Sequence, residues 1–164
     1  MPNLNNYPSY VAPAVAMYTP ANPTAPASTA TTYKMQGLGS LITPVTAAGN
    51  ILCQIEATLT DGATTVGEGI VLQMYYGPMV AGVAAPANAA SVPASAIAIG
   101  NPIEWATGVT LTTAADLVQP VHITGLAKGL IAGQQYWFDL GAYSVIGASQ
   151  VALTNVTVIL TEHG

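Results

Sequence analysis

The stretch Asn50–Thr60, NILCQIEATLT, decides the fold of this chain. Apolar side chains fall at every second position, at Ile51, Cys53, Ile55, Ala57 and Leu59. A period of two places alternate side chains on opposite faces of a β-strand. The stretch therefore predicts a strand with one face in a core and the other face exposed. Asp61 and Gly62 follow it and predict a hairpin turn.

Similar patterns recur along the chain after residue 33. Val, Ile, Thr and Tyr dominate these runs, as is typical of strand surfaces. The predicted strands are Gly69–Gly77, Pro120–Gly125, Gln135–Tyr143 and Val151–Thr161, with shorter ones at Leu38–Val45, Ala96–Ile99 and Val109–Thr112. Gly and Pro interrupt the Ala-rich stretch 81–98, which indicates a long loop and not a helix. We expect an all-β fold, an antiparallel β-sandwich of the jelly-roll type or a related Greek key.

The first 33 residues differ from the rest of the chain. They contain no charged residue and six of the twelve prolines. Proline fixes φ and lacks a backbone donor, so we expect an extended Pro-rich arm over residues 1–33 and a β-sandwich domain over residues 34–164. The alternative is a solvated linker. Apolar and aromatic residues in the arm favour anchoring on a neighbouring subunit. The candidate partner-binding residues are Tyr7, Tyr10, Val11, Val15, Met17 and Tyr18 in the arm and Trp105 in the sandwich.

Charged residues are scarce. Of 164 residues, 2 are Lys or Arg and 7 are Asp or Glu, which gives 5% charged residues and a net charge of −5. An ordinary soluble domain has roughly 25%. Two cations cannot neutralise a nucleic-acid backbone or form a polybasic membrane patch. No apolar run approaches the ~18 residues that span a bilayer. Because few charges protect a monomer poorly against association, we expect other subunits to cover much of the surface.

Catalytic and metal-binding patterns are weak. A His122–Asp139 pair with a nearby serine is conceivable, but no G-x-S-x-G elbow marks a nucleophile, and His122 is expected to face solvent or a subunit boundary. Cys53 alternates with isoleucines, which predicts a buried, inert thiol. The histidines and acids lack metal-ligand spacing. We expect no catalytic residue, no metal and no cofactor.

Aromatic residues offer a carbohydrate-stacking platform as an alternative role. The candidates are Tyr75, Tyr76, Trp105, Trp137 and Phe138. Consecutive strand residues such as Trp137 and Phe138 point to opposite faces, and aromatics in strands more often belong to a core. Trp105 is the best candidate for an exposed or interfacial aromatic.

Two resemblances follow from longer segments. Thr124–Leu140 contains a leucine, a glycine-containing turn and an aromatic strand, and it resembles the tyrosine corner of fibronectin-type sandwiches, in which Tyr136 would cap the turn through its hydroxyl. The layout of residues 37–161 is similar to that of small β-sandwich virion proteins of tailed bacteriophages. The segments that carry this likeness are Gly37–Ser40, the strand from Asn50, Met74–Gly77, Tyr136–Leu140 and Asn155–Val158.

The bacteriophage resemblance implies a virion structural protein, of the capsid decoration or the tail or fibre type. We therefore expect a non-enzymatic decoration (cement) protein that forms a homo-oligomer, with a trimer as one arrangement that capsid lattices offer. It would clamp onto the major capsid protein or another virion protein through the arm, without nucleic acid or membrane, in a virion assembled in the host cytoplasm. The alternative is a receptor- or glycan-binding head of a tail or fibre, with recognition in the loops 78–96 and 143–150.

Overall fold

The computed structural model describes residues 12–23, 32–47, 49–61, 69–80, 84–106, 117–144 and 151–163. These ranges contain strands, turns and loops and no helix. The strands are β1 (Val15–Tyr18), β2 (Lys34–Met35), β3 (Ser40–Ile42), β4 (Asn50–Asp61), β5 (Gly69–Pro78), β6 (Ile97–Ala106), β7 (Leu117–Ala127), β8 (Tyr136–Ser144) and β9 (Val151–His163). The predicted strand at Val109–Thr112 lies outside the described residues.

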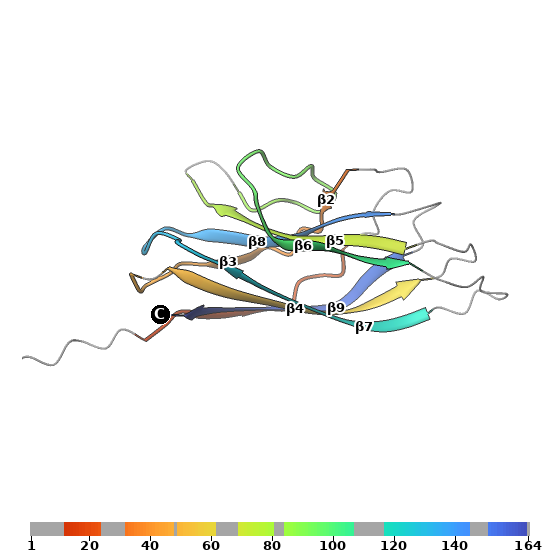
Figure 1. The fold of residues 1–164 in the computed structure, drawn as a ribbon, viewed down its shortest axis with the longest axis horizontal. Coiled ribbons are helices and arrows are strands. Elements are labelled where there is room, and N and C mark those ends of the chain that lie inside the picture. The colour runs from red at the N-terminus through yellow and green to blue at the C-terminus, as the bar shows by residue number, and fades with distance from the viewer. Residues whose placement is uncertain are drawn as a thin grey trace, which may run out of the picture.

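The strands form two stacked sheets (Figure 1). Sheet A has the order β1-β9-β4-β7, and sheet B has the order β2-β8-β5-β6 with β3 also paired to β8. The first strands of the chain pair with the last ones, and the pairing continues inward to the middle of the chain. The antiparallel pairs are β1 with β9, β2 and β3 with β8, β4 with β7, and β5 with β6. Such a long ribbon, folded over into two sheets, is a jelly roll. The predicted antiparallel β-sandwich is therefore confirmed.

The core lies between the two sheets. All the alternate apolar residues of β4 from Ile51 to Leu59 are buried there, including Cys53, whose exposed fraction is 0%. Opposite them, β5 contributes Ile70 and Leu72, and β8 contributes Phe138. The period of two in the sequence thus corresponds directly to the inner face of the sandwich.

The predicted tyrosine corner is present at the start of β8. The Tyr136 hydroxyl accepts a hydrogen bond from the backbone N–H of Ile131 at 3.1 Å. Tyr136 itself is buried. The hydroxyl therefore ties the turn between β7 and β8 to the strand that follows it.

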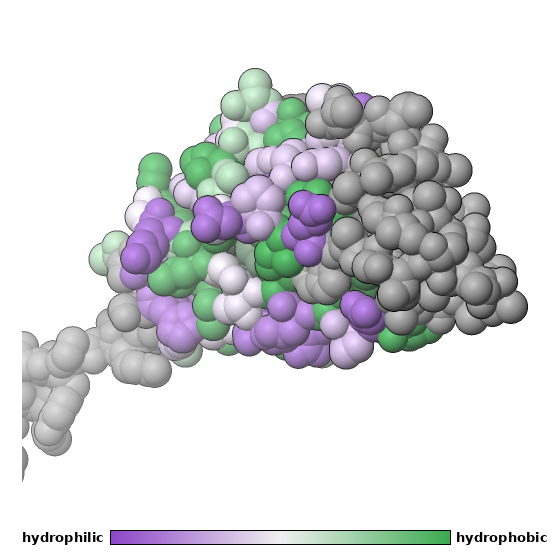
Figure 2. All heavy atoms as spheres, turned by 45° about the vertical axis from the view of Figure 1, so that its right-hand side comes forward, coloured by the Kyte–Doolittle hydropathy of each residue, from purple (hydrophilic) through white to green (hydrophobic). Residues whose placement is uncertain are grey.

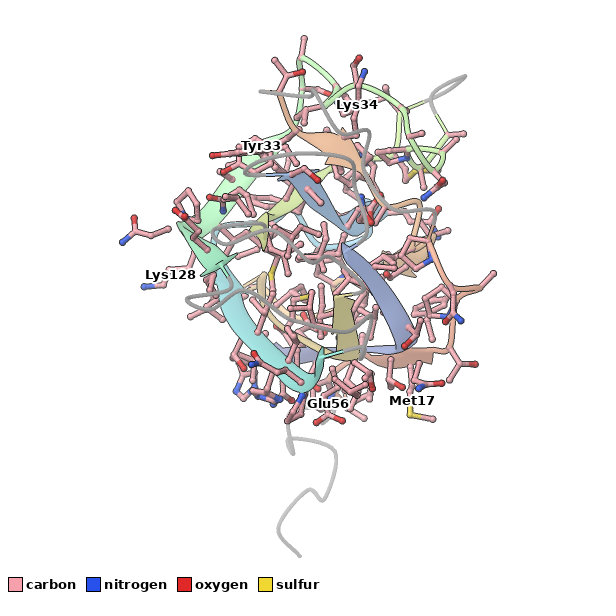
Figure 3. All side chains as sticks on the ribbon, turned by 90° about the vertical axis from the view of Figure 1, so that its right-hand side faces the viewer. Met17, Tyr33, Lys34, Glu56 and Lys128 are labelled. Carbon is pink, nitrogen blue, oxygen red and sulfur yellow. The ribbon has the colours of Figure 1, made fainter. Side chains whose placement is uncertain are left out.

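The outer face of sheet B is covered by the chain itself. Tyr33 lies on this face in edge contact with Tyr75 and Tyr143, at ring-centroid distances of 5.8 and 4.9 Å (Figure 3). Asp139 and Trp137 are buried although they alternate with the core residues of β8. Consecutive residues of β8 are therefore buried on both faces of the strand.

The aspartate side chain of β8 binds the loop between β2 and β3. The Asp139 carboxylate accepts backbone hydrogen bonds from Gly37 at 3.0 Å and from Leu38 at 3.2 Å, and one from Leu140 at 2.7 Å. Burial raises the pKa of Asp139 to about 7, although these backbone N–H groups lower it. Asp139 thus holds the covering segment on sheet B.

Three features differ from what the sequence predicts. The prediction of a hairpin at Asp61 and Gly62 is wrong. β4 lies in sheet A and β5 lies in sheet B, so the two strands do not form a hairpin. The strand expected at Ala96–Ile99 is longer and continues as β6 to Ala106. β1 lies within the predicted arm, yet it is an edge strand of the sandwich, paired with β9.

Candidate interaction surface

The outer face of sheet A consists of four strands that no described segment of the chain covers. In register, Val15, Thr161, Leu52 and Leu126 form one row across it. The next row contains Met17, Ile159, Gln54 and Thr124. A third row contains Thr157, Glu56 and His122. We call this set the sheet A outer face.

Apolar side chains are prominent on this face. The exposed fractions are 66% for Val15, 69% for Met17 and 41% for Leu126. Met17 and Glu56 project from the side of the molecule opposite Tyr33 (Figure 3). On the view shown in Figure 2, hydrophobic residues reach the surface between hydrophilic ones. The chain covers the outer face of sheet B with its own loops and leaves apolar residues on the sheet A outer face exposed.

Glu56 and His122 form an ion pair on this face when the histidine is protonated. His122 Nδ1 lies 3.4 Å from Glu56 Oε1, and His122 Nε2 lies 3.0 Å from Thr124 Oγ1. Both charged side chains are more than half exposed, so solvent screens the pair and it stabilises the fold little. His122 is exposed, as its alternation with Val121 and Ile123 predicted.

A hollow of about 500 Å³ lies beside this ion pair. We call it the polar hollow; Glu56, Thr58, His122, Asn155 and Thr157 are among its lining residues. It coincides with a β-bulge, where the register of β4 against β9 shifts between Glu56 and Thr58. Asn155 in the same region has a φ of +52°. Bulges turn side chains away from the regular face, and here the bulge opens the hollow.

β1 is held on the sandwich by Glu162 of β9. The buried Glu162 carboxylate accepts hydrogen bonds from the backbone N–H groups of Ala14, Val45 and Thr46 and from the Thr46 hydroxyl. Burial raises the pKa of this carboxyl, but the hydrogen bonds from Ala14, Thr46 and Val45 outweigh it and lower the pKa to about 2. Glu162 is therefore an anionic anchor for the strand that carries Val15 and Met17.

The predicted partner-binding residues of the arm separate into three groups. Tyr7, Tyr10 and Val11 lie outside the described residues. Val15 and Met17 are exposed on the sheet A outer face. Tyr18 is half-buried and donates its hydroxyl hydrogen to the Leu41 carbonyl at 2.6 Å, so it anchors β1 to its own chain.

Trp105 belongs to β6, where it pairs with Ile70 of β5. Its side chain lies outside the described part of the structure. Its role at an interface stays a prediction.

The residues weighed for catalysis are far apart in the topology. His122 lies on sheet A beside Glu56, whereas Asp139 is buried on sheet B and bound to backbone N–H groups. Cys53 is buried as predicted, and burial raises its pKa to about 12. Within the described ranges no three His, Cys, Asp or Glu side chains gather as a metal site, and no helix could cross a membrane.

Sequence reasoning missed three apolar residues of the sheet A outer face. Leu52, Leu126 and Ile159 lie opposite the core-facing positions of their strands. Their signal is a broken alternation: Val158 and Leu160 of β9 face the core, while Ile159 between them faces outward. An apolar residue at a strand position where the alternation predicts a polar one indicates that the outer face of the sheet is also apolar and contacts another surface.

No protein-family model matches the chain, and no curated protein matches it in sequence. Among solved structures, latent PorU from Porphyromonas gingivalis is similar with 8% identity and a TM-score of 0.44, over 92% of this chain and 12% of that chain. A chain of the infectious bursal disease virus particle is similar with 15% identity and a TM-score of 0.39, over 100% of this chain and 36% of that chain. The EclA C-terminal domain, a sugar-binding protein, is similar with 13% identity and a TM-score of 0.29, over 96% of this chain and 82% of that chain. This chain thus spans a small part of the first two proteins, and likenesses this weak do not establish what it binds.

Proposed function

We propose that this protein is a non-enzymatic structural protein of a virion, a capsid decoration (cement) protein that assembles with copies of itself and clamps onto the particle through its N-terminal arm. The observation that carries the proposal is the sheet A outer face, which exposes Val15, Met17 and Leu126, is covered by no described segment and includes β1 of the arm. The resemblance to small bacteriophage sandwich proteins supplies the virion context.

The mechanism is adhesion between preformed surfaces. The jelly roll is a rigid body, so its outer face loses little conformational entropy when it binds. Each apolar side chain that is fully buried contributes about 1.5–3 kcal/mol. A stable interface buries roughly 800 Å² on each partner, and the arm adds to the area that the strands contribute.

Charge on the sheet A outer face suits a second copy of the chain. Its described side chains include the carboxylate of Glu56 and the imidazoles of His122 and His163. A two-fold axis that passes between Glu56 and His122 would place Glu56 of one copy near His122 of the other, because an isologous interface repeats each contact in reverse. The face is therefore complementary to itself.

Sedimentation equilibrium tests this function. The protein is expected to form a discrete oligomer, and Met17→Lys or Leu126→Lys is expected to weaken association by at least about tenfold, since each places a charge in an apolar contact. Gln54→Lys, at a polar position of the same face, is the control for charge alone. A strict monomer at high concentration contradicts the proposal, as does an oligomer that neither apolar variant weakens.

Attachment to particles is a separate measurement. Co-sedimentation with phage heads stripped of their decoration protein is expected for the whole chain and is expected to be lost when residues 1–11 are removed. This truncation keeps β1 in place, so the fold of the sandwich is preserved. Unchanged attachment without residues 1–11 contradicts the clamp.

A glycan-binding head is the second candidate, and the polar hollow favours it. Glu56, His122 and Asn155 present a carboxylate, an imidazole and an amide around one concavity. Groups of this kind hydrogen-bond to sugar hydroxyls. Glycan-array binding that is lost in both Glu56→Gln and His122→Ala supports this candidate, and binding lost in Trp105→Ala alone places recognition in β6 instead.

A further inference from the structure

A second hollow, of about 280 Å³, lies at one end of the sandwich. It is formed by the end of β5, the start of β6 and the loop between β7 and β8. We call it the end hollow; its walls include Tyr76, Ile97, Lys128, Ile131, Gln134 and Tyr136. Most of these side chains are apolar or aromatic.

The aromatic walls of the end hollow are held in place by neighbouring groups. Tyr76 stacks on Phe138 with ring centroids 5.6 Å apart and 20° between the ring planes. Tyr136 is fixed by the hydrogen bond that its hydroxyl accepts from Ile131. The centroids of the Tyr76 and Tyr136 rings lie 6.3 Å apart. A pocket with fixed walls requires little reorganisation when a side chain enters it.

The rim of the end hollow is apolar and exposed. The exposed fraction is 50% for Ile97 and 68% for Ile131. Among the described residues that line the hollow, none is acidic and Lys128 carries a charge. A pocket with aromatic walls and an apolar rim has the composition of the centre of a protein interface. It suits an uncharged segment with aromatic side chains, and the Lys128 ammonium can contact the face of an inserted aromatic ring.

The end hollow and the start of β1 lie at the same end of the molecule. Ala14 is bound to Glu162, which also binds Val45 and Thr46. The segment that contains Val45 is in turn bonded to the β7–β8 loop, since the Pro44 carbonyl accepts a hydrogen bond from the Gly133 N–H. Figure 1 shows the β7–β8 loop and the start of β1 at this end, on its left. We call it the arm end.

The direction of β1 favours a neighbouring copy as the source of the segment. β1 runs from the arm end into sheet A, so the chain enters β1 from beyond that end. Ala12 and Pro13 are exposed there. Proline restricts the preceding residue to extended conformations, which opposes a reversal of the chain onto its own end hollow.

We propose that residues 1–11 of a second copy occupy the end hollow, with Tyr7 or Tyr10 inserted between Tyr76 and Ile131. This segment has no charged side chain and contains Tyr7, Pro8, Tyr10 and Val11. Its composition therefore matches the hollow in polarity. The inference rests on the proposed self-assembly and names the contact by which the arm performs it.

Mixed single-cysteine variants test the contact. Full-length Ser9→Cys and Ile131→Cys proteins are mixed in equal amounts and oxidised with glutathione disulfide, and the cross-linked species is measured on a non-reducing gel and by peptide mass. Ser9 lies between Tyr7 and Tyr10, so this substitution keeps both aromatic anchors. The yield of this heterodimer is expected to exceed the yield from Ser9→Cys mixed with Val118→Cys by about tenfold, since a seated arm raises the local thiol concentration. Val118 is a matched control because it is 60% exposed at the far end of β7. Cys53 is fully buried and does not compete.

Three outcomes overturn the inference. Equal yields for the two mixtures show that the arm has no preference for the end hollow. A disulfide that forms within the double variant Ser9→Cys/Ile131→Cys, with none between mixed single variants, assigns the hollow to the chain's own arm. Unchanged association of Ile131→Asp, a surface substitution, shows that the hollow does not contribute to assembly.

The mass of the unmodified protein separates this inference from the proposed function. If the unmodified protein is an oligomer and the mixed Ser9→Cys and Ile131→Cys variants give no more cross-link than the control mixture, the arm contact is refuted and assembly through the sheet A outer face is left intact. A monomer at all concentrations refutes both.

Discussion

Ala14 and Glu162 are joined twice. The Glu162 carboxylate accepts a hydrogen bond from the Ala14 N–H at 2.9 Å, and the Glu162 backbone N–H donates to the Ala14 carbonyl at 2.8 Å. The first bond uses the side chain and the second continues the sheet. Through this pair, the start of β1 is attached to the last strand of the chain, and the same carboxylate also binds the loop before β4.

Glu162→Gln is expected to destabilise the protein by about 2–4 kcal/mol, because hydrogen bonds to a charged group contribute most and the new amide NH₂ faces backbone N–H donors. Urea denaturation measures the loss. Glu56→Gln, at an exposed carboxylate of β4, is the control and is expected to change stability by less than about 0.5 kcal/mol. Equal effects of the two variants contradict the anchoring role of Glu162.

Stability is expected to depend on pH through two carboxyls with opposite signs. The pKa of Glu162 is lowered from 4.5 to about 2 in the fold, so its contribution is complete above pH 4.5 and is lost as the pH falls toward 2. The pKa of Asp139 is raised from 3.8 to about 7, so the folded state loses stability as the pH rises from 3.8 to about 7. Urea midpoints measured from acidic to neutral pH should peak in the weakly acidic range.

Two variants test which carboxyl causes each change of stability, the loss at acidic pH and the loss toward neutral pH. Glu162→Gln is expected to flatten the acidic limb, and Asp139→Asn is expected to flatten the loss of stability toward neutral pH. Asp139→Asn also loses an acceptor for the Gly37 or Leu38 N–H and should lower stability in weak acid as well. A profile whose limbs survive both substitutions shows that other groups titrate.

Gly49→Ala is expected to cost more than Gly129→Ala. Both glycines have positive φ, +54° and +70°. A Cβ on Gly49 would lie 1.7 Å from the Leu130 carbonyl oxygen, whereas a Cβ on Gly129 meets nothing within 4 Å. The backbone strain of about 1–2 kcal/mol is common to both, so the excess for Gly49→Ala in thermal denaturation measures the clash. Equal losses contradict close packing at Leu130.

Tyr136→Phe is expected to destabilise the protein by about 0.5–1.5 kcal/mol, because the ring stays buried while the Ile131 N–H loses its acceptor. Hydrogen exchange at Ile131 should accelerate in this variant, and that at Ile55 in the centre of β4 should change only as much as global stability does. Unchanged exchange at Ile131 contradicts the tyrosine corner.

The Cys53 thiol is expected to react with a thiol reagent only through global unfolding. The side chain is fully buried, and burial raises its pKa to about 12, so neither access nor thiolate is available in the folded state. The labelling rate should therefore follow the unfolding free energy across urea concentrations. Fast labelling in the absence of denaturant contradicts a buried, inert thiol.

The strands, the lone buried cysteine and the tyrosine corner were predictable because each rests on a local pattern. Ile51 to Leu59 alternate with a period of two, and Tyr136 follows its turn at a fixed short distance. The exposed sites of Val15 and Met17 were predictable in part, since an uncharged segment with apolar residues needs a covering surface. Their position on the same sheet face as Leu52 was not predictable, because β1 and β4 join one sheet only through β9, which lies between them and near the other end of the chain.

The sequence by itself determined the inner face of each strand and the scarcity of charge, because alternation and composition are properties of neighbouring residues. Only the tertiary structure decided what covers the other face. Trp137 and Phe138 point to opposite sides of β8 and both are buried. Phe138 lies in the core, whereas Trp137 lies on the outer face of sheet B, where Tyr33 packs on Tyr143 and the β2–β3 loop is bonded to Asp139. Met17 alternates in the same way on β1 and stays exposed, because no described segment covers the outer face of sheet A. The alternation along a strand specifies the face to which each side chain points, and the long-range pairing of the strands specifies what lies against that face.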